Sequence, residues 1–198
     1  MLTLVPVGAA DVEWLRVQRN EPAQYKYFRQ DRPISEVEQK RWWRQLDHKY
    51  VRLYTVREGD KDGERIGYVG FNPFNKYAMS AEFGLFILAE HQKKGYGREA
   101  LTRLLHKGFN EFNIRTIYSD CLEYRGEDRF KFYEELGFVK KSPETQNLAY
   151  KKLGEWIPSI KFFMTKEMFD GYIRKGKLGL KRAPEPVRVA EKKRRGRP

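Results

Sequence analysis

The sequence predicts an α/β fold in which a mixed, mostly antiparallel sheet of about seven strands is flanked by helices. Short runs that alternate between apolar and polar residues interleave with segments whose apolar residues recur at helical spacing. Three strand-like runs precede a helix and a further strand, which is the order of an antiparallel meander followed by a β-α-β crossover. The 198 residues, 40% hydrophobic and 15% aromatic, suffice for one ordinary core.

The first third of the chain is predicted to form one strand and two helices. Residues 2–7 form the strand, and Asp11 is expected to cap a helix that runs to about Asn20. A loop or short helix follows. Ser35 and Glu38 have the three-residue spacing of a capping box, which predicts the start of the second helix.

The middle of the chain is predicted to form a hairpin, a third strand and a long helix. Residues 51–57 and 66–71 alternate enough to be strands, with a turn at residues 59–63 between them. Residues 80–88 form the next strand and lead into a glycine-containing turn. The helix after this turn has an apolar stripe made by Leu101, Leu104, Leu105, Phe109 and Phe112.

The last third of the domain is predicted to add three strands and a short helix. Residues 115–122 form a strand, and residues 128–136 form a helix that ends at Gly137, the expected C′ residue. Two final strands, at about residues 146–152 and 156–164, complete the sheet.

The charge distribution divides the chain into a domain, residues 1–173, and a basic tail, residues 174–198. The domain ends in a helical or docking segment at residues 168–173. The net charge is +13, and the tail holds eleven Lys and Arg against two acids, so it carries +9 and the domain +4. The low hydrophobicity of the tail predicts that it is disordered. A segregated basic block is typical of segments that bind polyanions.

Composition excludes several classes of site. The chain has no run of 18 apolar residues and no signal-peptide pattern, so we expect a cytoplasmic protein with no membrane partner. The single cysteine, Cys121, excludes an intramolecular disulfide, and the three histidines are too scattered for a metal motif. Cys121 lies in an apolar segment, so it is expected to be buried and structural rather than a nucleophile.

The turn Gln92–Gly97 is the strongest functional signal. It joins an apolar strand to a helix, so its backbone N–H groups are expected to point outward at the positive helix end, where phosphate oxygens bind. Gly95 and Gly97 permit positive φ and the close approach of a ligand, and Lys93 and Lys94 add positive charge. Taken alone, the same pattern also describes an ordinary tight turn.

Two motifs together resemble the GCN5-related N-acetyltransferase (GNAT) superfamily. Gln92–Gly97 is similar to its acyl-CoA signature, Gln/Arg-x-x-Gly-x-Gly/Ala, and Arg129–Phe138 resembles its FYxxLGF helix. The resemblance covers about residues 2–166. Further segments are similar to the branch that holds ribosomal-protein N-terminal, spermidine and nucleotide-sugar acetyltransferases. These segments are Arg19–Pro22, Ile34-Ser35, Trp42-Trp43 and Gly154–Ile157.

The resemblance implies the GNAT fold, with a sheet splayed at a cofactor groove, and acetyl-CoA as the cofactor. The expected cofactor contacts lie on the strand before the turn, in the turn, and around the following short helix. They are Phe86, Ile87, Leu88, Gln92, Lys93, Lys94, Gly95, Tyr96, Gly97, Arg98, Asp128 and Phe132. Many relatives carry Asn where this chain has Gly126, so Asp128 or Arg125 is expected to replace that contact.

The resemblance also implies two catalytic residues. Acetyl transfer to an amine needs a base that deprotonates the ammonium and an acid that protonates the departing thiolate. Glu82, beside the groove, is the candidate base, although its position also suits a solvent-facing strand residue. Tyr133 matches the family's usual acid, and its alternative role is packing against the sheet. One or two of five aromatic residues are expected to line an acceptor pocket, the rest packing in the core: Tyr25, Tyr27, Phe28, Trp42 and Trp43.

The basic tail ends in a short motif that resembles an AT-hook. The terminal residues are Lys192, Lys193, Arg194, Arg195, Gly196, Arg197 and Pro198. In an AT-hook, Gly permits close approach to the minor-groove floor, and the arginines seek the negative potential there. The alternatives are general affinity for nucleic acid, with association with the nucleoid, and a solvated basic tail without a partner.

The sequence therefore indicates an acetyl-CoA-dependent N-acetyltransferase that acts on a primary amine by direct attack in a ternary complex. The acceptor is left open among a small molecule, a nucleotide sugar, a peptide N-terminus and a modified nucleobase. The alternatives are an acyltransferase that modifies DNA, RNA or a nucleic-acid-bound protein, and a non-catalytic DNA-binding protein with this fold. The protein is expected to be a monomer or a homodimer.

Overall fold

A central sheet of eight strands organises the computed structural model, which describes residues 1–46, 52–72, 75, 77–125, 127–142, 149–152 and 154–178. The strand order is β1-β2-β3-β4-β5-β8-β6, and β7 pairs with β8. The strands are β1 (Leu2–Pro6), β2 (Arg52–Glu58), β3 (Arg65–Phe71), β4 (Ser80–Ile87), β5 (Thr116–Leu122), β6 (Val139–Lys140), β7 (Ala149–Lys152) and β8 (Glu155–Thr165). The pair β4–β5 is parallel and the other pairs are antiparallel, which confirms the predicted mixed sheet with a meander and a crossover.

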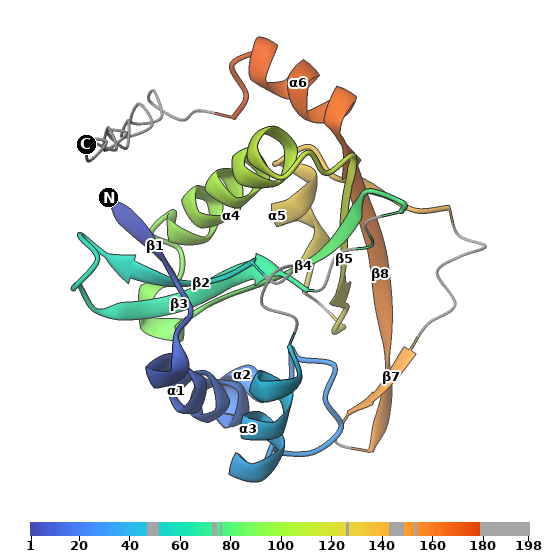
Figure 1. Ribbon diagram of the computed structural model, residues 1–198. Coiled ribbons are helices and arrows are strands. Elements are labelled where there is room, and N and C mark those ends of the chain that lie inside the picture. Colours follow the sequence, from blue (N-terminus) through green and yellow to red (C-terminus); the bar gives the residue numbers. More distant parts are fainter. Residues whose placement is uncertain are drawn as a thin grey trace, which may run out of the picture.

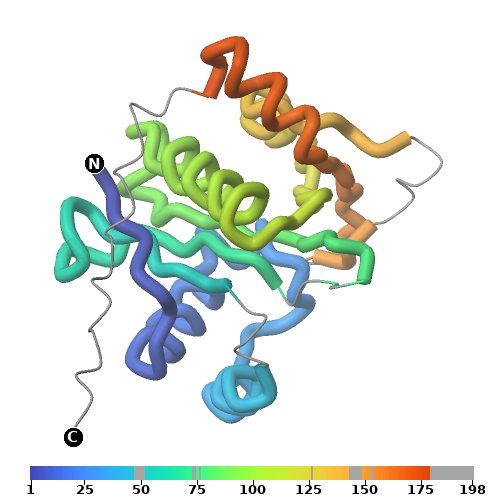
Figure 2. Tube along the Cα trace, turned by 45° about the horizontal axis from the view of Figure 1, so that its top comes forward, coloured from blue at the N-terminus to red at the C-terminus, as the bar shows by residue number. Residues whose placement is uncertain are grey.

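Helices cover both faces of this sheet (Figure 1). One face carries α1 (Ala9–Asn20), α2 (Pro22–Tyr25) and α3 (Glu36–Gln45), and the opposite face carries α4 (Tyr96–His106) and α5 (Phe130–Glu134). A 3₁₀ helix, η1 (Ala89–His91), precedes α4, and a π-helical turn, η2 (Lys107–Glu111), continues it. The helix α6 (Lys166–Arg174) follows β8. Figure 2 shows α4 lying across the strands, with α6 beside it. We call the two faces the α1–α3 face and the α4–α5 face.

The start of α1 differs from the sequence prediction. The N-cap is Gly8, and Asp11 lies inside the first turn at N3. From there Asp11 Oδ2 accepts a hydrogen bond from the Gly8 backbone N–H at 2.9 Å, so Asp11 caps the helix from within rather than from its first position. Its other oxygen, Oδ1, accepts from Arg65 Nε at 2.8 Å and ties the helix to β3. The predicted position of the cap was therefore wrong by three residues.

The second predicted helix begins as its sequence indicates. Ser35 is the N-cap of α3, and its Oγ accepts a hydrogen bond from the Glu38 backbone N–H at 3.3 Å. Glu38 Oε2 accepts in return from the Ser35 N–H at 3.0 Å. The capping box is confirmed, and so is the β2–β3 hairpin, whose register pairs Arg52 with Phe71.

Each face of the sheet has its own apolar cluster. On the α4–α5 face, Leu101, Leu104 and Leu105 of α4 are fully buried, which confirms the predicted stripe. On the α1–α3 face, a smaller cluster joins Leu15, Phe86 and Leu88. Since successive strand residues face opposite sides, the end of β4 contributes to both clusters.

The C-terminal part of the domain closes the α4–α5 face. Gly137 ends the α5 segment with φ +95°, as predicted, and the Tyr172 ring of α6 covers it. Segment 168–173 is helical, as part of α6, and Leu178 is buried in the main core. The predicted strand at 146–152 is seen as Ala149–Lys152, since residues 143–148 lie outside the described ranges. Within those ranges no helix is long and apolar enough to cross a membrane.

Candidate active site

The two central parallel strands separate at Glu82. The register pairs of β4 and β5 are Ser80 with Thr116, Ala81 with Ile117 and Glu82 with Tyr118. Beyond Glu82 the β4 strand runs on to Ile87 and keeps its pairing with β3 alone among the described strands. Ser119 Oγ donates to the Phe83 carbonyl at 2.8 Å where the strands part. An extended ligand can therefore pair with the free edge of β4, in the manner of an added strand.

The turn after β4 brings the start of α4 to the end of this free edge. Gly95 is the N-cap of α4 and has φ +86°, and Lys93 has φ +60°. Gly97 lies in the first turn of the helix without a positive φ, so the chain does not use the positive φ that a glycine permits at this position. The chain has already reversed at Lys93 and Gly95, and Gly97 instead allows close packing. A Cβ built there would lie 3.7 Å from Ile87 Cγ1 and 3.7 Å from Phe132 Cζ.

Three predicted cofactor contacts use their side chains within the protein. Gln92 Nε2 donates to the Ile87 carbonyl at 2.8 Å and ties the turn to the strand end. Tyr96 donates its hydroxyl hydrogen bond to Glu58, and Arg98 pairs with Glu135 at 2.7 Å. The backbone N–H groups at the start of α4 and the exposed Lys93 and Lys94 are left to face a ligand.

Phe86, Ile87 and Leu88 present their side chains to the two cores. Phe86 packs with Phe28 at a ring-centroid distance of 5.6 Å on the α1–α3 face, and Ile87 belongs to the main core. Any contact that they make with a bound chain must therefore come from their backbone. Asp128 Oδ1 accepts from the Lys131 N–H at 3.1 Å and caps the start of α5, while Gly126 lies outside the described residues.

Tyr133 lies on the α4–α5 face of the splayed strands. Its ring stacks on Phe162 with centroids 4.3 Å apart, and it also contacts Phe83 and Phe138. Burial raises the pKa of the Tyr133 hydroxyl well above its usual value, so the phenol keeps its proton at neutral pH. A phenol in this state can donate a proton to a stronger base nearby.

Glu82 reaches the other face of the sheet, where it meets a basic residue. Its carboxylate forms an ion pair with Arg29, which also lies 3.4 Å from Asp120 Oδ1. Ser159 Oγ donates to Asp120 Oδ2 at 2.6 Å. Sequence reasoning missed Arg29, Asp120 and Ser159. Of these three residues, Asp120 alone had a usable signal in the sequence. It is an acid within an alternating strand, two positions after Tyr118, and Tyr118 is the register partner of Glu82.

The aromatic residues predicted for an acceptor pocket divide into two groups. Tyr25, Tyr27 and Phe28 precede Arg29 in the chain and contact basic side chains: Lys152 Nζ lies 4.2 Å from the Tyr25 ring, and Arg129 Cζ lies 3.6 Å from the Tyr27 ring. Trp42 and Trp43 are on α3, and Trp43 lines a separate pocket of about 410 Å³ with Tyr54 and Phe112. Phe28 is part of the smaller core, as one alternative predicted.

Cys121 is buried on the α4–α5 face beside these aromatic residues. Burial raises the pKa of its thiol to about 12, so it stays protonated and cannot act as a thiolate nucleophile. The expected structural role of this cysteine is confirmed.

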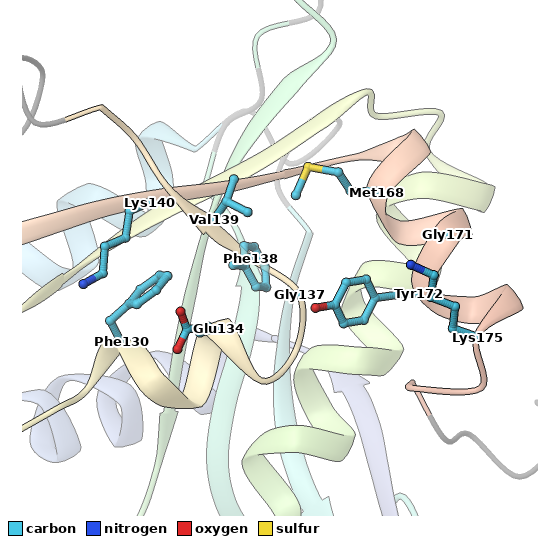
Figure 3. A pocket seen from close by; sticks show the side chains of 10 residues that line it. All are labelled: Phe130, Glu134, Gly137, Phe138, Val139, Lys140, Met168, Gly171, Tyr172 and Lys175. Atoms are coloured by element: carbon cyan, nitrogen blue, oxygen red, sulfur yellow. The ribbon is translucent and has the colours of Figure 1, made fainter.

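A further pocket of about 550 Å³ lies between α5, β6 and α6 (Figure 3). Phe130, Phe138 and Met168 line it, and the Tyr172 ring faces Gly137. It contains none of the predicted catalytic or cofactor residues. Within the described residues no group of three His, Cys, Asp or Glu side chains could hold a metal ion. The predicted nucleic-acid contacts, Lys192–Arg197, lie outside the described residues.

A family model supports this arrangement of elements. The model described as an acetyltransferase (GNAT) domain matches residues 1–139. A spermidine N(1)-acetyltransferase from Vibrio cholerae is 34% identical over 89 residues, which are 45% of this chain and 50% of that relative. The chain thus aligns with about half the length of this curated relative.

Solved structures show the same fold. A crystal structure of spermidine N-acetyltransferase from Vibrio cholerae, in complex with CoA and spermine, superposes with a TM-score of 0.75 at 23% identity. This match covers 85% of this chain and 97% of that one. A dodecameric structure of spermidine N-acetyltransferase from the same organism, in an intermediate state, gives a TM-score of 0.69 at 22% identity. It covers 85% of this chain and 95% of that one.

Proposed function

Because the chain belongs to the GNAT acetyltransferase family, we propose that it transfers an acetyl group from acetyl-CoA to a primary amine. The observation that carries this proposal is that β4 and β5 separate after Glu82. At this point Glu82 lies on one face of the sheet and Tyr133 lies on the other. Donor and acceptor can then meet at the point of separation from the two sides. The expected reaction is direct attack in a ternary complex.

The donor side has the features that CoA requires. The N–H groups at the start of α4 would bind the pyrophosphate, and Lys93 and Lys94 would add charge. A Cβ at Gly95 would meet no atom within 4 Å, so the backbone of the turn is open to a ligand. The free edge of β4 from Phe83 to Ile87 would pair with the amides of the pantetheine arm.

Two side chains would move the protons. Acetyl-CoA supplies the activated acyl group when it is bound. Glu82 would take a proton from the acceptor ammonium, directly or through water, after the contact with Arg29 has opened. Tyr133 would hold its phenolic proton for the departing sulfur, and burial keeps that proton in place.

The test is release of CoA thiol from acetyl-CoA in the presence of a panel of amines. The panel includes spermidine and spermine, since the relatives are named for spermidine and one contains spermine. It also includes amino sugars, peptides with free N-termini and aminated nucleobases. Turnover with at least one amine, and none without an amine, is expected. Failure to bind CoA at millimolar concentration would rule the proposal out.

The basic tail supports a second, additional role near nucleic acid. Its Lys192–Arg197 segment and its +9 charge over residues 174–198 favour contact with polyanions. Deletion of residues 179–198 keeps Leu178, which is buried, and removes the segment outside the described domain. Loss of salt-dependent DNA binding with an unchanged rate on small amines would support a tether. Acyl incorporation into polynucleotide, lost on the same deletion, would instead support modification of nucleic acid.

A further inference from the structure

Glu82 and Asp120, the two acids on the α1–α3 face, already share a cation that the chain itself supplies. Arg29 pairs with Glu82 and lies 3.4 Å from Asp120, so one guanidinium stands between two carboxylates. The loop that carries Arg29 is fixed to α1. Gln30 Nε2 donates to the Arg19 carbonyl at 3.2 Å, and the Asn20 side chain bonds both N–H and C=O of Ile34. A cationic acceptor would have to compete with this guanidinium.

A second guanidinium in this region, that of Arg19, has no carboxylate partner among the described residues. Arg19 is mostly buried, and its Nε atom has no hydrogen-bond partner among the residues that the structure describes. Its Cζ atom lies 5.2 Å from the centroid of the Phe28 ring. Burial, together with the nearby charge of Arg29, lowers the pKa of Arg19. A mostly buried cation without an opposite charge is costly unless a ligand compensates it.

Lys152 adds a third positive charge to the same region. Its side chain is 2% exposed, and its ammonium donates to the Gln30 carbonyl beside the Tyr25 ring. Burial lowers the pKa of Lys152; the charge of Asp31 opposes this, and the positive charge of Arg19 adds to it.

Tyr68 links these cations to the candidate base. Its hydroxyl lies over Gly84 of β4, where a built Cβ would come within 2.5 Å of the oxygen. The Tyr68 and Phe28 rings both pack on Phe86, with centroids 5.5 Å and 5.6 Å away, and Arg19 lies over Phe28, so Arg19 and Tyr68 share one region. The charges of Arg19, Arg29 and Glu82 also act on the Tyr68 hydroxyl. The region therefore offers one carboxylate pair held by Arg29, and an unpaired cation, Arg19, on the same side of the sheet.

We propose that the acceptor is an amine that carries an anionic group, a carboxylate or a phosphate, and that Arg19 binds this group. The proposal rests on the proposed N-acetyltransferase function. The amine would be directed to Glu82 and the anion to Arg19, with Arg29 shared between them. A polyamine offers no anion for Arg19, and its ammonium groups would meet three basic side chains in place of free carboxylates. The acceptor class thus differs from that named for the relatives.

The test compares amines that differ in one anionic group, with CoA release as the readout. β-Alanine is compared with propylamine, and 3-aminopropyl phosphate with 3-aminopropanol, while spermidine represents the polyamines. We expect kcat/KM for at least one anionic amine to exceed that of its uncharged match by about tenfold or more, since a hydrogen bond to a charged group has that worth. The anionic amine with the higher kcat/KM shows whether the bound group is a carboxylate or a phosphate. A kcat/KM for spermidine above that of both β-alanine and 3-aminopropyl phosphate would overturn the proposal.

Variants of Arg19 assign the preference to this residue. In Arg19→Gln, the ratio of the two kcat/KM values should fall to within about twofold of unity, mainly through a raised KM for the anionic amine. Arg19→Lys keeps the charge and should retain part of the preference. Arg16→Gln is the control: Arg16 lies one turn earlier on α1 and pairs with Glu13. If Arg19→Gln lowers kcat/KM equally for the anionic amine and for its uncharged match, Arg19 is structural and the proposal fails.

A binding measurement separates this inference from the proposed reaction. Titration calorimetry of the CoA complex with 3-aminopropyl phosphate and β-alanine needs no turnover. Binding of one acid by the full chain, weakened about tenfold in Arg19→Gln, supports the inference even if no amine is acetylated. Absence of binding by both acids contradicts the inference, even where propylamine or spermidine is acetylated.

Discussion

The proposed donor side and the proposed acceptor side of this site are built from different kinds of group. On the donor side, the free edge of β4, the turn at Gly95 and the start of α4 present backbone groups from one continuous segment. On the acceptor side, Arg19, Arg29, Asp120 and Lys152 come from segments far apart in the sequence and present side chains. Backbone groups on the donor side do not depend on side-chain identity, whereas each charge on the acceptor side can be changed by one substitution.

The largest effect should come from Tyr133, the side chain proposed to protonate the departing thiolate. Tyr133→Phe removes the phenolic proton and leaves the stacking on Phe162 in place. We expect kcat to fall by about 10²-fold or more, with the melting temperature little changed. Tyr172→Phe, which packs over Gly137, is the matched control. Equal rates for wild type and Tyr133→Phe would show that Tyr133 only packs.

The next effect tests whether the donor side depends on backbone shape. Gly95→Ala forces a Cβ into φ +86°, which should cost about 1–2 kcal/mol of stability and weaken CoA binding. Gly97→Ala is the control, because its Cβ would make ordinary contacts at 3.7 Å. The measurements are the free energy of unfolding in urea and the Kd for CoA. If the two variants behave alike, the left-handed turn is not what the donor side needs.

A smaller effect should come from the buried lysine on the acceptor side. Lys152→Met removes a buried charge, and the free energy of unfolding at neutral pH should rise by about 1 kcal/mol. Since burial lowers the pKa of Lys152 in the folded state, wild-type stability should rise with pH between that lowered pKa and the usual 10.5. The variant should lack this rise. Lys151→Met, at the exposed neighbouring position, should show no change.

The smallest effect concerns the charge balance of the acceptor side. Arg29→Gln releases Glu82 and Asp120 from their shared cation. We expect kcat/KM for spermidine to rise severalfold relative to β-alanine, a modest change because the Arg29 side chain is 45% exposed and its ion pairs are partly screened. Arg32→Gln, whose side chain pairs with the exposed Glu38, serves as the control. A fall in spermidine turnover would mean that Arg29 holds Glu82 in position instead of blocking it.

The same contrast explains which features could be predicted from sequence. Gly95, Gly137 and the Ser35–Glu38 box are local signals, since each acts within a few residues of itself. The fold class followed from the order of such signals. Even local reasoning has limits: Gly97 and Asp11 carry the right residue types, but neighbouring residues take the positive φ and the N-cap position.

The acceptor side could not be predicted in this way. Arg29 meets Asp120 across 91 positions of sequence, and no periodicity connects them. Arginine side chains are ordinarily exposed, so composition gives no reason to expect Arg19 of α1 and Arg29 of the following loop beside the candidate base. The five aromatic residues were visible in sequence, but only tertiary packing separates Phe28, in the smaller core, from Trp43, beside another pocket.

The early end of the β4–β5 pairing has a mechanical consequence. The sheet consists of two stiff halves, β1–β4 and β5–β8, whose mutual ladder has three register pairs, all at one end. Aromatic packing such as Phe83 on Phe162 joins the halves elsewhere. A chain that pairs with β4 in the fork would extend that joint, so amide exchange should slow in both halves when CoA binds. Slower exchange in both halves would show that the point where β4 and β5 separate also controls the motion of the two halves.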